Sequence, residues 1–171
     1  MACRQTGFAM LCEGNVQEVM DLSPVAHLAA LSGKVPFINF FDGFRTSHEI
    51  QKIAVWDYKD LADMCDMDAV KAFREHALNP EHPAMRGSHE NGDTFFQHRE
   101  ACNQYYDALP EVVEKYMGKI NEKLGTDYKL FNYYGAPDAD RVIIAMGSIC
   151  DVAEEVIDYP VSYTHLTLPT N

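Results

Sequence analysis

The chain has 171 residues, enough for one ordinary domain with a hydrophobic core, and hydrophobic residues make up 47% of it, as in globular proteins. Its formal net charge of −12 argues against binding to nucleic acid or to an anionic membrane face, since both attract basic surfaces. No apolar run approaches the length of a membrane span and no signal peptide opens the chain, so we expect a cytoplasmic protein that acts away from the membrane.

Residues 15–31 are predicted to form an amphipathic helix, because apolar side chains recur through them at helical spacing. Asn15 is suited to cap the start of this helix and Gly33 to end it. Pro24 lies inside the pattern. Because proline removes one backbone hydrogen bond and clashes with the preceding turn, we expect a kink or a local break there.

An uninterrupted apolar run, VPFINFF at residues 35–41, predicts a parallel strand that is covered on both faces. The loop that follows carries four candidate functional residues: Asp42, Arg45, His48 and Glu49. Ligands of open α/β sheets bind beyond the carboxyl ends of the strands, where this loop lies. These side chains are therefore candidates for a wall of the active site or for a subunit contact, and the alternative is a solvated loop.

Two short helices are predicted at residues 59–65 and 68–77, the second capped by Asp68. A long irregular stretch follows at residues 79–94, with Pro80 among its helix-breaking residues. Loops of this length in compact domains are typically functional or bridge subunits.

The last third of the chain alternates between helix and strand. A helix opens with Pro110 in its first turn and stops at Gly125. Two strands, at residues 128–133 and 141–146, and a final helix at residues 150–159 follow. The Gly-Ser turn between the second strand and this helix suits a phosphate at the helix N-terminus, although an ordinary βα turn has the same composition.

Histidines and cysteines are numerous but do not follow the spacing of metal sites. Four histidines lie in or near the long loop, and none shares the spacing of a known metal motif, so we interpret them as surface hydrogen-bonding groups: His76, His82, His89 and His98. The five cysteines are scattered without a C-x-x-C pair, which predicts reduced thiols and no metal or cluster site in this chain.

Five motifs, in the same order along the chain, resemble the pyruvate:ferredoxin (flavodoxin) oxidoreductase family, large thiamine-diphosphate and iron–sulfur enzymes of anaerobic metabolism. Together they span most of residues 1–159, and motifs of this length and order are highly specific. They are ACRQTGFAML (2–11), VQEVMDL (16–22), FFDGFRTSHEIQKI (40–53), ALNPEHP (77–83) and YKLFNYYGAPDADRVIIAMGS (128–148).

The resemblance implies an α/β fold in two parts. Residues 1–138 resemble the C-terminal part of the pyrimidine-binding domain, an incomplete thiamine-diphosphate-binding-type (Rossmann-like) domain, and residues 139–160 the first βα unit of a transketolase-C-like domain. Residues 161–171, VSYTHLTLPTN, look like a translated sequencing adapter; a genuine short strand is the alternative. We therefore expect the chain to be a fragment.

By the same resemblance, the parent enzyme oxidises pyruvate with coenzyme A to acetyl-CoA and CO₂ and passes the electrons to ferredoxin or flavodoxin. The family uses thiamine diphosphate, Mg²⁺ and 4Fe-4S clusters. Its cofactor-activating glutamate lies upstream of Met1, and its metal motif and cluster cysteines lie in later domains. We expect this chain alone to hold none of these cofactors fully and to be inactive.

Arg4, in the RQTG motif, resembles the family arginine that binds the pyruvate carboxylate, and the planar fork of a guanidinium suits that partner. The resemblance also favours a subunit contact for the loop with Asp42, because the family's active sites are assembled between domains, and it implies a homodimer. Two alternatives stay open: a parent that acts on another 2-oxo acid, and a non-catalytic assembly module.

Overall fold

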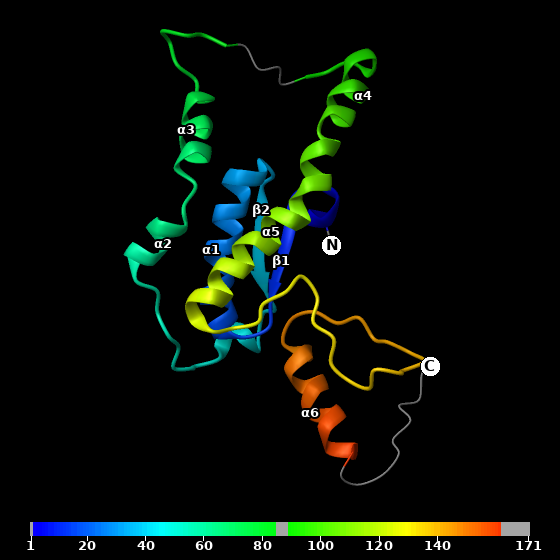
Figure 1. Cartoon of the computed structure of the whole chain (residues 1–171). Coiled ribbons are helices and arrows are strands. Elements are labelled where there is room, and N and C mark those ends of the chain that lie inside the picture. The colour runs from blue at the N-terminus through cyan, green and yellow to red at the C-terminus, as the bar shows by residue number, and fades with distance from the viewer. Residues whose placement is uncertain (1, 85–88, 162–171) are drawn as a thin grey trace.

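The computed structural model describes residues 2–84 and 89–161, and the side chains up to residue 159. Residues 162–171, nearly all of the predicted adapter tail, lie outside the described residues. The elements, in chain order, are η1 (Ala2–Gln5), β1 (Ala9–Glu13), α1 (Val16–Gly33), β2 (Phe37–Phe41), η2 (Thr46–His48), α2 (Tyr58–Met64), α3 (Met67–Glu75), α4 (Gly92–Ala101), α5 (Asn103–Leu124) and α6 (Ile149–Val161) (Figure 1).

A β1–α1–β2 unit forms the centre of the molecule (Figure 1). The two strands are parallel and in register from Ala9, which pairs with Phe37, to Glu13, which pairs with Phe41. Parallel strands need a crossover connection, and α1 supplies it. The predicted α/β class is confirmed, and the predicted strand at residues 35–41 is present from residue 37. The expected cover on both faces is wrong for the described residues, because Asn39 and Phe41 of this strand are exposed.

Helix α1 begins where its sequence predicts. The side chain of Asn15 accepts a hydrogen bond from Glu18 N at 3.0 Å, which satisfies one of the free N–H groups of the first turn. The helix runs through Pro24 without interruption. It also includes Gly33, which was expected to end it; the left-handed residue at the end is Lys34, with φ 56°.

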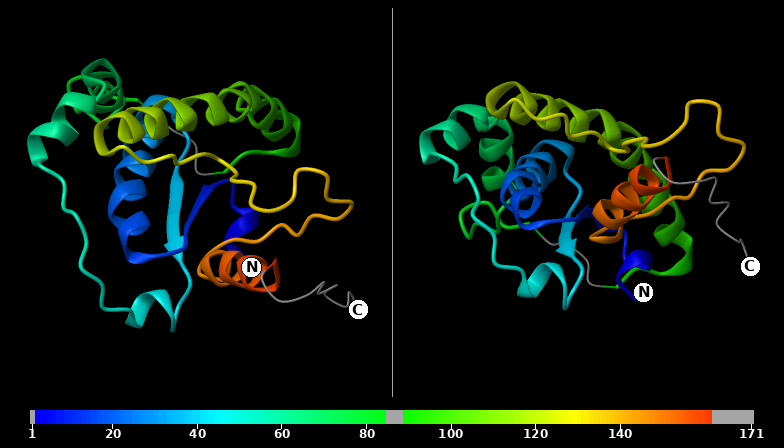
Figure 2. Two further views of the ribbon diagram at one scale, coloured as in Figure 1. Left: turned by 60° about the horizontal axis from the view of Figure 1, so that its bottom comes forward. Right: turned by 90° about the horizontal axis from the view of Figure 1, so that it is seen from below.

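The hydrophobic core lies between α1 and α5, which crosses α1 (Figure 2). Its fully buried side chains include Val25 of α1 and Tyr116 and Ile120 of α5. The close approach of the helices requires a small residue at Gly33, because a Cβ there would lie 2.8 Å from Cδ1 of Leu109. Burial of these apolar side chains is the main stabilising contribution, because a two-stranded sheet buries little apolar surface of its own.

The start of α5 differs from the expected one. The helix begins at Asn103, so Pro110 lies inside it and not in its first turn. Proline at this point leaves the carbonyl of Tyr106 without its usual helical donor. Burial of the neighbouring Leu109 in the core accounts for the continuation, since packing overrides a local propensity of this size. Gly125 ends the helix with φ 72°, as predicted.

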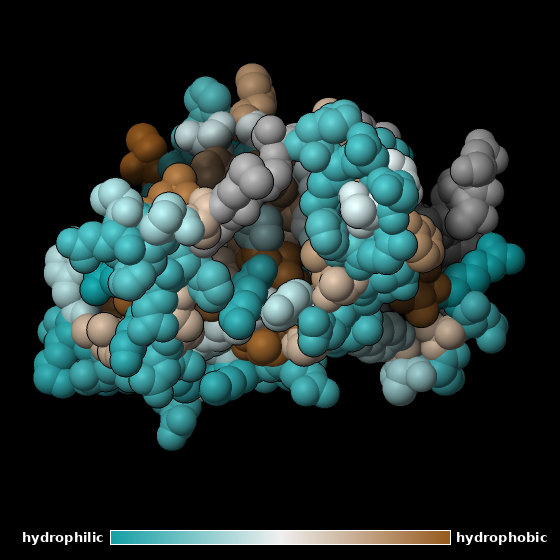
Figure 3. Space-filling view, turned by 90° about the horizontal axis from the view of Figure 1, so that it is seen from above, coloured by the Kyte–Doolittle hydropathy of each residue, from teal (hydrophilic) through white to brown (hydrophobic). Residues whose placement is uncertain are grey.

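Helices α2, α3 and α4 lie at the periphery (Figure 1). Lys119 of α5 donates from Nζ to the carbonyl of Met64 at 3.3 Å, which ties α2 to the core helix. Helix α3 is capped by Asp66 and not by Asp68, because the Asp66 carboxylate accepts from the N–H groups of Asp68 and Ala69. Figure 3 views the molecule from the end at which α3 and α4 lie, and apolar side chains show between polar ones on that face.

Neither strand predicted after α5 is formed. A strand needs a neighbour for its backbone hydrogen bonds, and residues 128–133 and 141–146 have no such partner among the described residues. Asn121 instead holds Tyr128, accepting from its N–H at 2.7 Å and donating to its carbonyl at 2.8 Å. In the second segment the apolar side chains are exposed, Ile144 by 85%.

Among the described residues, no helix is long and apolar enough to cross a membrane.

The α1–α5 core is tested by Ile120→Ala. Removal of this fully buried side chain is expected to lower the free energy of unfolding by about 3 kcal/mol, the scale for a buried Ile→Ala cavity. Urea denaturation followed by circular dichroism measures it. Leu124→Ala is the control, one turn later and 39% exposed, and is expected to cost much less. Equal losses in the two variants would contradict the assignment of the core.

Candidate functional site

The carboxyl edge of the sheet is formed by the ends of β1 and β2, because parallel strands end at the same edge. Asp42 follows β2 directly, as the sequence predicts. The N-terminus of α6 lies at this edge too (Figure 1). Three parts of the chain that are far apart in sequence therefore meet where α/β proteins usually bind ligands.

The carboxylate of Asp42 is hydrogen-bonded to other residues of the chain. Its Oδ1 accepts a hydrogen bond from Ser148 N at 2.9 Å and lies 3.0 Å from the hydroxyl of Thr46. The bond from the Ser148 N–H is the largest cause that lowers the pKa of Asp42 below its usual value. The same hydroxyl lies 3.2 Å from the carbonyl of Gly14, so Thr46 joins the loop to β1 as well.

The other loop candidates point to solvent. Arg45, His48 and Glu49 are exposed, and the side chain of this loop that is buried is Thr46. Nδ1 of His48 lies 2.9 Å from the hydroxyl of Ser47, within the same turn. These three side chains remain available for a partner surface.

Arg4 lies at the opposite edge. It belongs to the exposed 3-10 turn η1, which precedes the amino end of β1 (Figure 1). Strand β1 has five residues, which at about 3.3 Å per residue separates the two edges of the sheet by roughly 15 Å. The structure therefore does not bring Arg4 together with Asp42, Arg45, His48 and Glu49.

Glu13, at the end of β1, is a buried titratable residue that the sequence interpretation missed. Its side chain is fully buried, and neither carboxyl oxygen has a hydrogen-bond partner in the part of the chain that the structure describes. Burial, with a contribution from the charge of Glu18, raises its pKa to about 8. Glu13 is therefore mostly a neutral acid at pH 7. The available signal was alternation, since Glu13 continues the inward positions of Ala9 and Leu11.

A second acid, Glu18, lies in the first turn of α1. Its Oε2 accepts from Gly14 N at 2.6 Å, in the manner of a capping box. Burial is the main cause that raises the pKa of Glu18, and the carboxylates of Asp151 and Glu154 in α6 add to it. The carboxyl edge is thus crowded with acidic groups.

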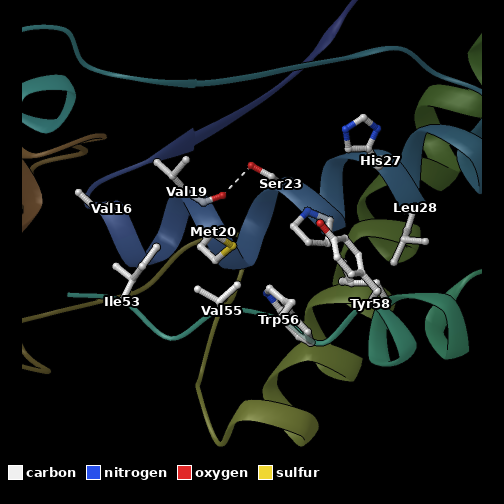
Figure 4. A pocket seen from close by; sticks show the side chains of 12 residues that line it. Val16, Val19, Met20, Ser23, His27, Leu28, Ile53, Val55, Trp56 and Tyr58 are labelled. Atoms are coloured by element: carbon white, nitrogen blue, oxygen red, sulfur yellow. Dashed lines mark hydrogen bonds between the residues drawn. The ribbon is translucent and has the colours of Figure 1, made fainter. Parts of the chain in front are cut away.

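A cavity lies elsewhere, between α1 and the extended segment that follows η2 (Figure 4). It is an open groove of about 650 Å³, with a lining that is mostly apolar. Two hydrogen bonds join the side chain of Gln17 to this segment: its Nε2 donates to the carbonyl of Ala54, and its Oε1 accepts from the N–H of Ala54. The lining residues are Val16, Val19, Met20, Ser23, Pro24, His27, Leu28, Ile53, Val55, Trp56, Tyr58 and Leu61.

Metal-binding side chains do not gather within the described residues: no three His, Cys, Asp or Glu residues there are arranged to hold an ion. All five cysteines are free thiols. Of the four histidines near the long loop, His98 lies with Nδ1 2.5 Å from Oε1 of Glu90.

Comparison with known protein families gives one match over residues 1–118, to the pyruvate flavodoxin/ferredoxin oxidoreductase, thiamine diphosphate-binding family. The chain belongs to this family. The resemblance predicted from the five motifs is thereby confirmed, and so is the thiamine-diphosphate-binding type of the domain.

Curated relatives match nearly the whole chain. It is 63% identical to a pyruvate-flavodoxin oxidoreductase of Enterobacter agglomerans over 158 residues, and 58% identical to a pyruvate:ferredoxin oxidoreductase of Moorella thermoacetica over 159 residues. These matches cover 92% and 93% of this chain, and 14% of the length of each relative. A pyruvate dehydrogenase [NADP(+)] of Cryptosporidium parvum is 48% identical over 159 residues, which are 93% of this chain and 8% of that relative.

The buried acid of β1 is tested by Glu13→Gln. The folded chain keeps the Glu13 proton up to about pH 8, whereas the unfolded chain loses it near pH 4.5. The stability that protonated Glu13 confers is therefore fully present below pH 4.5 and is lost as the pH rises to 8. Glutamine cannot ionise, so the variant should gain on the wild type over this window, by up to about 1.4 kcal/mol per pH unit.

Denaturant unfolding at several pH values measures this difference, with the exposed Glu49→Gln as the control. Parallel stability curves for the wild type and Glu13→Gln would contradict the burial of a neutral acid.

Proposed function

We propose that this chain is part of a pyruvate:ferredoxin (flavodoxin) oxidoreductase. The parent protein converts pyruvate and coenzyme A to acetyl-CoA and CO₂, and its electrons go to ferredoxin or flavodoxin. The observation that carries the proposal is the family match over residues 1–118, together with relatives of these names at 63% and 58% identity. The five cysteines, all free, suit the reducing cytoplasm that we propose as its compartment.

The electron acceptor is selected outside this segment. One relative named for flavodoxin, one named for ferredoxin and one named for NADP(+) match it at 63%, 58% and 48% identity. A segment that proteins with three different named acceptors share is poorly suited to distinguish between them. The 4Fe-4S clusters of the proposed parent would likewise need cysteines beyond the five scattered ones present here.

The described residues do not fit a complete site for thiamine diphosphate and Mg²⁺. At the carboxyl edge, the N–H of Ser148 already donates to the carboxylate of Asp42. Asp42, Glu18 and Asp151 gather there, and carboxylates repel a diphosphate. The groups that hold and activate the cofactor in the parent are therefore proposed to come from other parts of it.

Arg4 is proposed to receive the pyruvate carboxylate in the parent. Its exposed position on η1 leaves the guanidinium accessible, and this group can donate two parallel hydrogen bonds to a carboxylate. In this role Arg4 binds the carboxylate and not the side chain of the substrate, so the same residue would bind another 2-oxo acid.

Residues 139–160 are proposed to begin a transketolase-C-like domain. The family match ends at residue 118, before this unit. An extended run with exposed Val142, Ile143 and Ile144 leads into α6, and apolar side chains on both faces are typical of a strand inside a parallel sheet. The exposed Arg45, His48 and Glu49 are proposed as contacts within a homodimer or as a wall of its active site.

The first test concerns the cofactor. Calorimetric titration of this chain with thiamine diphosphate and Mg²⁺ is expected to give no tight binding, because the groups that would hold the diphosphate are not among the residues described. The parent protein, titrated in the same way, is the control and should bind it. Tight one-to-one binding to the chain alone would contradict the proposed division of the site.

The second test is kinetic and uses the parent enzyme. Arg4→Ala is expected to raise the KM for pyruvate and to lower kcat/KM by about tenfold or more, about 1.4 kcal/mol, as a charge-assisted hydrogen bond to substrate is lost. Arg4→Lys should recover part of the loss, because an ammonium group lacks the two-pronged geometry. Cluster content and thiamine diphosphate binding should not change.

Arg74→Ala, which removes an exposed arginine from α3, is the matched control. If Arg4→Ala leaves pyruvate kinetics intact, the RQTG motif is structural. Assays with other 2-oxo acids, each with reduction of ferredoxin or flavodoxin as the readout, identify the substrate; no reduction with any of them would overturn the proposed function.

A further inference from the structure

The carboxylate of Asp42 joins two segments that are 106 residues apart in sequence. Ser148 directly precedes α6, so its N–H is among the backbone donors that the start of a helix leaves without a helical partner. A carboxylate that accepts from this N–H makes one of the two bonds of a capping box, a bond that normally comes from the helix's own first turn. Here it comes from the end of β2, which places an anion at the positive end of α6.

The junction around this bond is tight. Gly147 has φ 82°, and a Cβ on it would lie 3.3 Å from Asp42 Oδ1 and 3.8 Å from Sγ of Cys12. A Cβ on Gly14 would lie 3.3 Å from the carbonyl oxygen of Gly147. The turn before α6 and the end of β1 are therefore in backbone-to-backbone contact beside Asp42.

The charges of the helix oppose this contact. Asp151 and Glu154 of α6 lie close enough to Glu18 of α1 to disfavour its ionised form. Like charges at this spacing repel one another. The hydrogen bond from the Ser148 N–H to Asp42 is an attraction across the junction that opposes this repulsion.

We propose that Asp42 acts as a clasp: its carboxylate holds the turn before α6 against the carboxyl edge of the sheet, and loss of this bond releases α6 while the α1–α5 core stays folded. The clasp fixes the position of the unit at residues 139–160 relative to the thiamine-diphosphate-binding part, and it is independent of which substrate the parent oxidises. Asp42 is a positioning residue in this role.

Two cysteines at the junction report on the clasp. Cys12 of β1 and Cys150 in the first turn of α6 are both half-buried, and burial raises the pKa of both thiols, that of Cys12 to about 11. The thiolate is the nucleophile that attacks an alkylating reagent, so both cysteines should react slowly while α6 is docked. Cys65 and Cys102 are half-buried in other parts of the chain and serve as internal controls.

The experiment measures alkylation of each cysteine by iodoacetamide, from peptide masses at successive times. In Asp42→Ala, the rate at Cys150 is expected to rise by about tenfold, the change in thiolate that one unit of pKa produces. Cys12 should also react faster, but the charge of Asp42 itself raises the pKa of Cys12, so Cys150 is the decisive reporter. Asp42→Asn keeps one acceptor oxygen and should give an intermediate rise. Gly147→Ala keeps the charge of Asp42 but disturbs the junction, since its Cβ would lie 3.3 Å from Asp42 Oδ1 on a backbone with φ 82°, and it should also raise the rate at Cys150.

Glu49→Gln removes a carboxylate from the same loop and should leave all rates unchanged. Hydrogen exchange gives a second readout: amides of α6 should exchange faster in Asp42→Ala, and those of α1 and α5 should not. An unchanged rate at Cys150 would overturn the proposal, whatever the rate at Cys12. So would a uniform rise at all cysteines with faster exchange in α1 and α5, since that result would make Asp42 a determinant of the whole fold and not a clasp.

Discussion

The packing of α5 across α1 holds this structure together. A parallel pair of two short strands is marginal in water, because it buries little apolar surface and leaves two free edges. The side chains between the helices, with Tyr116 and Ile120 at their centre, supply the burial that the sheet lacks. Gly33 permits the close approach, and a hydrogen-bonding contact between the hydroxyls of Ser32 and Tyr116 lies at the same crossing.

Because α1 connects β1 to β2, its packing against α5 also fixes the position of the two strands and of the carboxyl edge at which they end. The edge is acidic, and the Ser148 N–H at the start of α6 already donates to Asp42, which distinguishes this edge from an anion site. The exposed residues that suit a partner lie around it and beyond it: Arg45, His48 and Glu49 on the loop, and the apolar run before α6. We interpret these surfaces as contacts for further parts of a protein whose curated relatives are several times longer than this chain.

Local signals in the sequence predicted the elements whose determinants are local. The cap at Asn15, the stop at Gly125 and the apolar strand before Asp42 all depend on residues within a turn or two. Features set by distant contacts were not predictable in this way. The early start of α5 depends on core packing around Pro110, and residues 128–133 and 141–146 have strand composition but no neighbour to pair with in the part of the chain that the structure describes.

The candidate site shows the same division. Motifs identified the family and placed Asp42 at the end of a strand, yet its partner is 106 residues away. Nothing short-range in the sequence indicates that bond. The burial of Glu13 likewise depends on what covers β1, although the alternation of inward positions along the strand pointed to it.

The neutral state of Glu13 has a consequence for the heat of folding. With a pKa of about 8 in the folded chain, Glu13 stays mostly protonated at pH 7, and the folded chain is close to one unit less negative than its formal charge of −12. Folding at pH 7 therefore takes up a proton from the buffer. The enthalpy of unfolding measured by calorimetry then includes the protonation enthalpy of the buffer, so phosphate and Tris solutions report different heats for the same conformational change.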